Sequence, residues 1–457
     1  MSKSLNPVCF AALLVSLLAV TIFVGCPAAE KPAVEEPAAE EPAAEEPAAE
    51  EPPIEEPAIE EPAIEQPAAK TPAEEIPPVE LPPIETPEVK TEPVEVPAIE
   101  PPGVDAPAEK EPAAKAPTVK PIAADKVKLL VEVPAPNDTP DGMCLMPDGN
   151  IILAVPNVNS YLATEDKTQV NPPKLLKITP DNKIEHFMDF PMHPKTGKGF
   201  PFGICVGPQG DLYATDLQWF ADPEKPGNNA RVLRIPIKDG KPAGEPVVVI
   251  EGMVVANAVI CHGGYLYVSD TSMIPDSKPL ISGIFRVKLD KEGTKLTLPL
   301  KDDPQLVATI ETHNPDVGFG ADGLTFDSKG NLYCGNFADG TLHKIEFDAE
   351  GKVKSNTIFA KVPQMKSCDG IFCDLKTDKI YVADSLANAV QVVSPDGTVT
   401  TLVQDVESDG ENGRLDQPCE VLIRGKELII SNFDMPVTGG VNTKFETPNT
   451  VSVFPLD

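Results

Sequence analysis

From residue 125 onward, short apolar runs and turns recur as one unit that is repeated six times. Each unit begins with a short strand, usually polar and then apolar, passes a turn, and continues into a second apolar strand that ends in a small or acidic residue. A third strand follows in every unit and a fourth in the first five. Four strands at a spacing of roughly 45–65 residues are typical of the blades of a β-propeller. The opening residues of the six units are Asp141, Phe202, Asn257, Asp322, Asp369 and Cys419.

The last unit is one strand short, because it ends with Val451-Ser-Val-Phe near the C-terminus. A matching strand stands at the start of the repeat region, in residues 126–133. If this strand completes the last blade, the ring closes and no sheet edge is left open. The pattern therefore predicts an all-β fold over residues 123–457, a six-bladed β-propeller of four-stranded blades closed by its N-terminal strand.

Two segments precede this predicted propeller. Residues 1–26 contain an apolar run that ends in Phe23-Val24-Gly25-Cys26, which resembles a bacterial lipobox with Cys26 as the lipidated residue. An uncleaved anchor and ordinary signal-peptide cleavage are the alternatives. All three predict export, and a lipoprotein would face the periplasm or the cell surface from either membrane.

Residues 27–122 repeat a Glu-Glu-Pro-Ala motif with a five-residue period, which fits neither helix nor strand. Because proline lacks an N–H donor and the glutamates repel one another, we expect a disordered linker or stalk. The whole chain carries a net charge of -33, and more than half of it belongs to this segment. Without a basic face, nucleic-acid binding is excluded, since phosphate contacts need Lys and Arg.

The first residues of the innermost strands should surround the mouth of the central channel. That ring would bring Asp141, Asp322 and Asp369 together with Asn257, and Glu420 lies beside Cys419. Several carboxylates at one mouth favour a bound cation, and oxygen ligands suit calcium or another divalent cation. Zinc would need His or Cys ligands at regular spacing, which the chain lacks. The alternative is that Asp-Gly pairs are ordinary turn residues, copied with the repeat.

The second strands also end in polar residues, including Asp216, Asp270 and Asp384. These lie at the same end of each blade as the predicted mouth. We expect them to cap strand ends rather than to bind a ligand. Seven cysteines follow Cys26, an odd number that argues against a complete disulfide framework. Cys368 and Cys419 occupy matching repeat positions and could pair.

Several segments resemble the SMP-30/gluconolactonase family of six-bladed propellers. They are Thr139-Pro-Asp-Gly-Met-Cys, Asn257-Ala-Val-Ile and Asp322-Gly-Leu. The resemblance implies a divalent metal on the axis, held by a Glu, Asn side chains and an Asp that also acts as acid or base. Carried over, it implies metal ligands at Asn257, Asp322, Glu420 and Asp141, with Asp322 and Asp141 as catalytic residues. The predicted ring adds Asp369 as a further metal ligand. Phe202 stands where a further Asn ligand is expected.

Two functions follow from this pattern. The first is a calcium-dependent lactone or ester hydrolase that acts on a small lactone or sugar-derived substrate. Since no G-x-S-x-G motif is present, a covalent serine route is disfavoured. The second is a non-catalytic propeller similar to NHL-repeat proteins, which would bind an envelope ligand. In both cases we expect a monomer that meets the membrane only through its lipid anchor.

Overall fold

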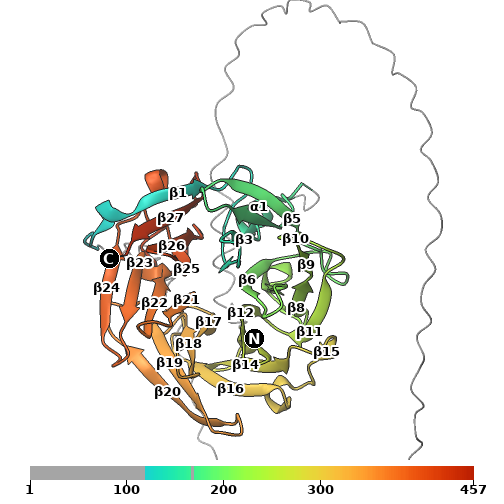
Figure 1. The fold of residues 1–457 in the computed structure, drawn as a ribbon. Helices are drawn as coiled ribbons and strands as arrows, with labels where there is room; N and C mark the ends of the chain where they lie inside the picture. The colour runs from blue at the N-terminus through green and yellow to red at the C-terminus, as the bar shows by residue number, and fades with distance from the viewer. Residues whose placement is uncertain (1–118, 166–168, 457) are drawn as a thin grey trace, which may run out of the picture. The chain divides into compact units, whose positions relative to one another are not determined.

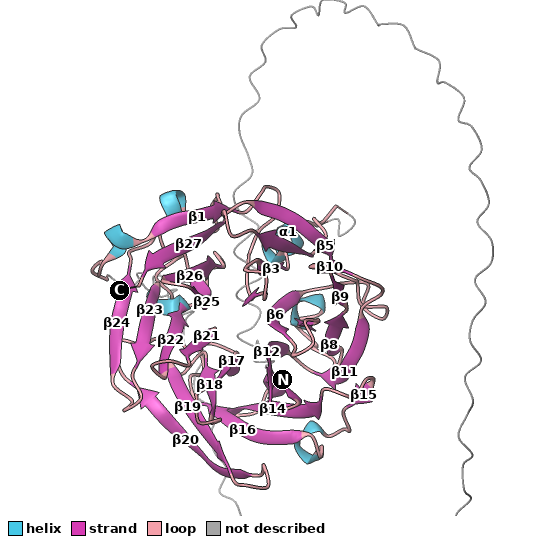
Figure 2. Ribbon diagram, viewed as in Figure 1, coloured by secondary structure: helices cyan, strands magenta, loops and turns pink. Residues whose placement is uncertain are grey.

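The computed structural model describes residues 119–165 and 169–456, which form a ring of six antiparallel sheets (Figure 1). Strands dominate the ring (Figure 2), and α1 (Val158–Ala163) is the one α-helix among the described residues. None of their helices is long or apolar enough to cross a membrane. The predicted lipobox and nearly all of the predicted linker lie outside the described residues. Short 3-10 turns occur at Ala124–Lys126, Trp219–Ala221, Leu300–Asp302, Ser385–Ala387 and Glu411–Gly413.

The first three blades follow the predicted order, from the innermost strand outward. Blade 1 contains β2 (Met143–Leu145), β3 (Ile151–Val155), β4 (Lys174–Ile178) and β5 (Ile184–Asp189). Blade 2 contains β6 (Pro201–Val206), β7 (Leu212–Asp216), β8 (Ala230–Ile235) and β11 (Val247–Met253). Blade 3 contains β12 (Ala256–His262), β13 (Tyr265–Ile274), β14 (Leu280–Lys288) and β16 (Leu306–Thr312). Blade 2 also gains a fifth strand that the repeat does not predict, because β15 (Thr294–Lys295) pairs in parallel with β11. A separate hairpin joins β9 (Ile237–Lys238) and β10 (Lys241–Pro242).

The last three blades complete the ring. Blade 4 contains β17 (Ala321–Phe326), β18 (Leu332–Asn336), β19 (Thr341–Phe347) and β20 (Val353–Lys361). Blade 5 contains β21 (Ile371–Asp374), β22 (Lys379–Asp384), β23 (Ala389–Val393) and β24 (Val399–Gln404). Blade 6 contains β25 (Pro418–Arg424), β26 (Glu427–Asn432), β27 (Thr450–Pro455) and β1 (Lys128–Glu132).

The predicted closure of the ring is confirmed. β1 is antiparallel to β27, with Lys128 opposite Val453 and Glu132 opposite Thr450. Leu130 and Val451 belong to the same buried cluster, so the closing strand is packed as well as hydrogen-bonded. The ordered body begins slightly before residue 123, since Ile122 forms a bridge with Gln404 of β24.

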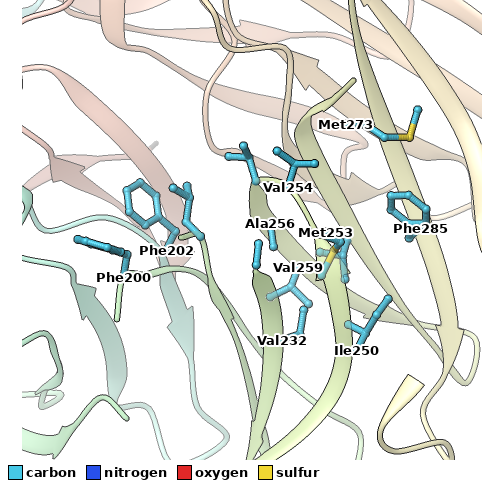
Figure 3. Close-up of a cluster of buried hydrophobic side chains, with 14 of the residues drawn as sticks. Phe200, Phe202, Val232, Ile250, Met253, Val254, Ala256, Val259, Met273 and Phe285 are labelled. Atoms are coloured by element: carbon cyan, nitrogen blue, oxygen red, sulfur yellow. The ribbon is translucent and has the colours of Figure 1, made fainter. Parts of the chain in front are cut away.

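The core of the ring lies between the blades. Every residue of β7 is buried, because a middle strand of a blade is covered by a neighbouring blade on each face. Figure 3 shows such a cluster, in which Phe200 and Phe202 of the second blade pack with Val254 and Val259 of the third. These apolar contacts hold the innermost strands in fixed positions around the axis.

Side-chain hydroxyls add a second kind of contact between blades. Four Ser or Thr residues near the end of a second strand donate hydrogen bonds to a carbonyl near the start of the first strand of the next blade. The pairs are Thr215 with Asn257 O, Thr271 with Ala321 O, Ser385 with Pro418 O and Ser431 with Pro140 O, at 2.6–2.9 Å. Because each accepting carbonyl lies within two residues of a ring residue, these bonds help to fix the channel mouth.

All seven cysteines in the described residues are free. The suggested Cys368–Cys419 pair does not form, and both residues are buried. The structure instead brings together Cys205 of β6 and Cys261 of β12, with their sulfur atoms 3.6 Å apart. Both are partly exposed. Sequence position gave no sign of this pair, because it depends on how blades 2 and 3 are set against each other.

We expect mild oxidation with copper phenanthroline to join Cys205 and Cys261. Each thiol loses a proton and gives one electron to the oxidant, and an S–S bond forms. Peptide mass spectrometry should then find a Cys205–Cys261 cross-link and a loss of two free thiols. The variant Cys205→Ser should keep Cys261 reduced under the same treatment. A dominant cross-link that involves Cys368 or Cys419 would contradict this expectation.

Candidate functional site

The ring at the channel mouth is built by the first strand of each blade. Asp322 lies in β17, and Asp141 and Asp369 come two residues before β2 and β21. Asp141 and Asp322 are 7% and 5% exposed. Asp369 and Glu420 are partly exposed. The structure thus places four predicted carboxylates, from four blades, in one confined region.

A β-bulge explains how Glu420 joins the ring although it follows Cys419. The pairing of β25 with β26 shifts register between Pro418 and Glu420. Similar shifts occur at the start of β6, β12 and β17. A bulge re-aims the side chains around it, so that consecutive residues can contribute to one site. Cys419 Sγ contacts the Pro140 carbonyl at 3.3 Å and is hydrogen-bonded to the Asp141 carboxyl.

The four carboxylates interact strongly with one another. Burial is the main cause that raises the pKa of each, and that of Asp141 reaches about 7. The pKa values of Asp322, Asp369 and Glu420 rise well above their usual ranges, and in each case the charges of other ring carboxylates add to the effect of burial. Asp322 and Asp369 are hydrogen-bonded to each other, which favours a protonated Asp322. The ring therefore holds more acidic groups than it can keep ionised at once.

Each carboxylate is also held by its own surroundings. Ser385 Oγ lies 2.6 Å from Asp369 Oδ2 and 2.6 Å from the Pro418 carbonyl. Glu420 Oε1 accepts a hydrogen bond from the backbone N–H of Val421 at 2.8 Å. None of the ion pairs between described residues includes a ring carboxylate. Their charge is therefore not balanced by a Lys or Arg side chain of this part of the chain.

The donor types fit a hard cation, since carboxylate and amide oxygens are the ligands that calcium prefers. The positions of these side chains fit a cation less well than their chemistry does. Among residues 119–165 and 169–456, no group of three or more His, Cys, Asp or Glu side chains stands in positions that could hold a metal ion. Asn257 lies in β12, where its backbone carbonyl accepts the bond from Thr215. A cation would therefore have to draw the ring side chains closer together.

An aromatic row borders the carboxylates on one side. We use this name for eight rings that are connected through pairwise contacts, with the centroids of contacting rings 5.0–6.1 Å apart. They are Tyr161, Phe200, Phe202, Trp219, Phe220, Phe319, Phe337 and Phe433. Phe202 stacks on Phe220 and contacts Phe433 from blade 6. The ring position that was expected to carry a further Asn thus belongs to this apolar group. Several of these rings lie on the loops that follow second strands.

The polar residues that end the second strands have a structural role. All six are fully buried, namely Asn157, Asp216, Asp270, Asn336, Asp384 and Asn432. Asp270, for example, accepts hydrogen bonds from the backbone N–H groups of Val254 and Val255, both at 2.9 Å. Asp216 accepts one from Phe200 N and pairs with Arg231 at 2.9 Å. These residues fix the segment that leads into each first strand, in agreement with the expected capping role.

Two surface clefts are found away from the ring. One, of about 710 Å³, lies beside the closing strand and is lined by residues that include Glu132, Glu411 and Pro448. The other, of about 480 Å³, lies on the outer strands of blade 3 near Arg286. Neither cleft includes a ring carboxylate.

No protein-family model matches the chain, and no curated protein matches it in sequence. Solved structures with similar folds include a gluconolactonase from Xanthomonas campestris, at 14% identity and a TM-score of 0.45, over 76% of this chain and 99% of that one. A luciferin-regenerating enzyme gives 12% identity and a TM-score of 0.48, over 74% and 95%. A PQQ-bound aldose sugar dehydrogenase from Streptomyces coelicolor gives 18% and 0.46, over 74% and 99%. At these values the likenesses assign neither a family nor an activity.

Proposed function

We propose that the channel mouth is the active site of a divalent-cation-dependent hydrolase that opens lactones or related esters. The observation that carries the proposal is the set of four carboxylates from four blades, which share one buried region without a basic partner. Asp141, Asp322, Asp369 and Glu420, with Asn257, would hold calcium or another divalent cation. When bound, the cation would polarise the ester carbonyl and stabilise the negative charge that develops on its oxygen.

The chain itself would supply the proton transfer. Asp141 has a pKa of about 7, so it can accept a proton from water near neutral pH. Asp322 shares a hydrogen bond with Asp369 and would act as the second acid or base. The aromatic row offers an apolar wall against which a sugar-derived ring or acyl chain can pack.

A panel of sugar and acyl lactones tests this function. After chelation, we expect turnover to return when calcium is added back to the full-length protein. Asp322→Asn and Asp141→Asn should each lower kcat/KM at least about 100-fold, the usual loss for a general acid or base. The matched control is Asp290→Asn, an exposed carboxylate in the turn after β14. A wild-type protein without any cation-dependent turnover would rule out the hydrolase.

The aromatic row favours a second candidate, a non-catalytic binding propeller. Phe202 replaces a polar side chain with a buried ring at the mouth itself. Binding of an envelope ligand without hydrolysis would then be expected, and Phe202→Ala should weaken that binding while the ring variants leave it unchanged. For both candidates we propose an exported monomer with a lipid anchor at Cys26.

A further inference from the structure

Most of the unsatisfied buried polar atoms gather in one loop region, away from the ring carboxylates. The described residues contain six buried side-chain N or O atoms that lack a hydrogen-bond partner. Four of the six are oxygens of residues on the loops where blade 6 meets blade 1: Asn159 Oδ1, Asp434 Oδ1, Asn442 Oδ1 and Glu446 Oε2. We call the group formed by Asn159, Asp416, Asp434, Asn442 and Glu446 the rim cluster.

Hydrogen bonds connect the members of the rim cluster to one another. The backbone N–H of Glu446 donates to Asp434 Oδ2 at 2.8 Å. Asn442 Nδ2 donates to Asp416 Oδ1 at 2.5 Å, and Asn159 Nδ2 donates to the Asp434 carbonyl at 3.4 Å. The donors of both Asn side chains are therefore used, while their oxygens and one oxygen of each of two carboxylates remain without a donor.

Three members of the rim cluster are deeply buried, whereas Asn159 and Glu446 are partly exposed. Asp416 and Asp434 are 1% exposed and Asn442 is 3% exposed. The only basic side chain paired with the cluster among the described residues is Lys444, which is largely exposed and reaches Glu446 Oε1, not Oε2, at 3.8 Å. Burying an unpaired oxygen is unfavourable, and more so when the group is charged. Four such acceptors in one loop region favour a positive partner.

We propose that the rim cluster is a second cation site, in which calcium binds Asp434, Glu446, Asn442 and Asn159, with Asp416 beside them. Calcium accepts carboxylate and amide oxygens in irregular arrangements of six to eight ligands, and such a mixed set suits a loop. The oxygens that lack a hydrogen-bond partner belong to two carboxylates and two amides. The rim cluster is therefore not a centre of three acidic ligands, in line with the absence of such groups from the described residues. It is independent of the ring and of the proposed hydrolysis.

The bound ion would fasten the loop between β26 and β27. This loop supplies Asp434, Asn442 and Glu446, whereas Asn159 belongs to α1 of blade 1. An ion at this point would link the last blade to the first on the side of the channel mouth. The rim site would therefore stabilise the junction at which the ring is closed.

Calcium titration of the full-length chain tests the proposal. The double variant Asp434→Asn/Glu446→Gln should lose one tight calcium ion per chain relative to wild type. Its matched control, Glu407→Gln/Asp409→Asn, removes the same charge nearby, but Glu407 and Asp409 contribute no unpaired oxygen. The control should keep the site, as should Asp322→Asn, which alters only the ring. Weak binding by the acidic segment 27–122 is common to all variants and cancels in the comparison.

A second readout is tryptic cleavage after Lys444, which lies in the loop. Calcium at ten or more times its Kd should slow this cleavage at least about tenfold in wild type and in Asp322→Asn, because binding lowers the population of the open, cleavable loop by that factor. It should give no protection to the double variant. If that variant does not fold, Glu446→Gln alone keeps the backbone N–H bond to Asp434 and serves instead. Equal calcium binding and equal protection in wild type and variant would overturn the proposal and leave water or protons as the partners of these oxygens.

Discussion

Without divalent cations, the protein should lose stability as the pH rises from 5 to 8. The Asp141 carboxyl ionises near pH 4 in an unfolded chain but at about 7 in the fold. Between these values the unfolded state has released the proton while the folded state keeps it, so the free energy of unfolding falls with increasing pH. For Asp141 alone the loss between pH 5 and 8 is about 2.5 kcal/mol. The raised pKa values of Asp322, Asp369 and Glu420 act in the same direction.

Urea unfolding at several pH values, in the presence of a chelator, measures the slope of the free energy of unfolding against pH. Asp322→Asn should flatten it and stabilise the fold at pH 8 by at least about 1 kcal/mol, the equivalent of one pKa unit. Asp416 and Asp434 of the rim cluster have pKa values raised to about 8 and about 9, mainly by burial, and add to the wild-type slope. The difference between wild type and Asp322→Asn therefore isolates the ring. Equal slopes for wild type and Asp322→Asn would show that the pKa of Asp322 is not raised in the fold.

Replacing Gly370 by Ala should destabilise the protein by several kcal/mol and displace Glu420. A Cβ atom at this position would lie 2.5 Å from the Cys419 carbonyl oxygen and 2.5 Å from Glu420 Oε1. The carbonyl belongs to the backbone of the next blade, and Gly370 N already donates to it at 2.8 Å. Overpacking of this kind usually lowers stability by about 1–3 kcal/mol, and more where the backbone cannot move.

Gly318 provides the matched control, because no atom lies within 4 Å of a Cβ placed there. Gly318→Ala should be neutral or slightly stabilising, since it reduces the freedom of the unfolded chain. Thermal unfolding of both variants makes the comparison, and calcium binding reports the state of Glu420. Equal melting temperatures for the two variants would mean that blades 5 and 6 can separate at the mouth at little cost.

The fold was predictable because its signal is repeated. Six copies of one strand pattern, with one strand missing at the C-terminus and one to spare near residue 128, lead directly to a closed ring. The repeat also predicted the ring carboxylates, because each first strand enters the same mouth. It could not show that Glu420 is turned inward beside Cys419, since a β-bulge breaks the alternation on which such predictions depend.

The sequence could not predict features that depend on contacts between different units. The Cys205–Cys261 pair requires the relative setting of blades 2 and 3, which no single strand encodes. The rim cluster draws its members from three separate loops or turns, in which no periodicity indicates which residues will meet. The role of Phe202 could be predicted only in part. The sequence showed that it replaces a polar residue, and only the structure shows that its ring joins seven others.

The pairing of β1 with β27 constrains the order in which the strands can fold. Its partners lie more than 300 residues apart in sequence, so this contact has the largest loop-closure entropy in the propeller. During synthesis, β1 leaves the ribosome first and must wait until the last strand has emerged. Until then blade 6 is incomplete and β26 presents an open edge. Loss of β27 should thus leave the first strand without a partner.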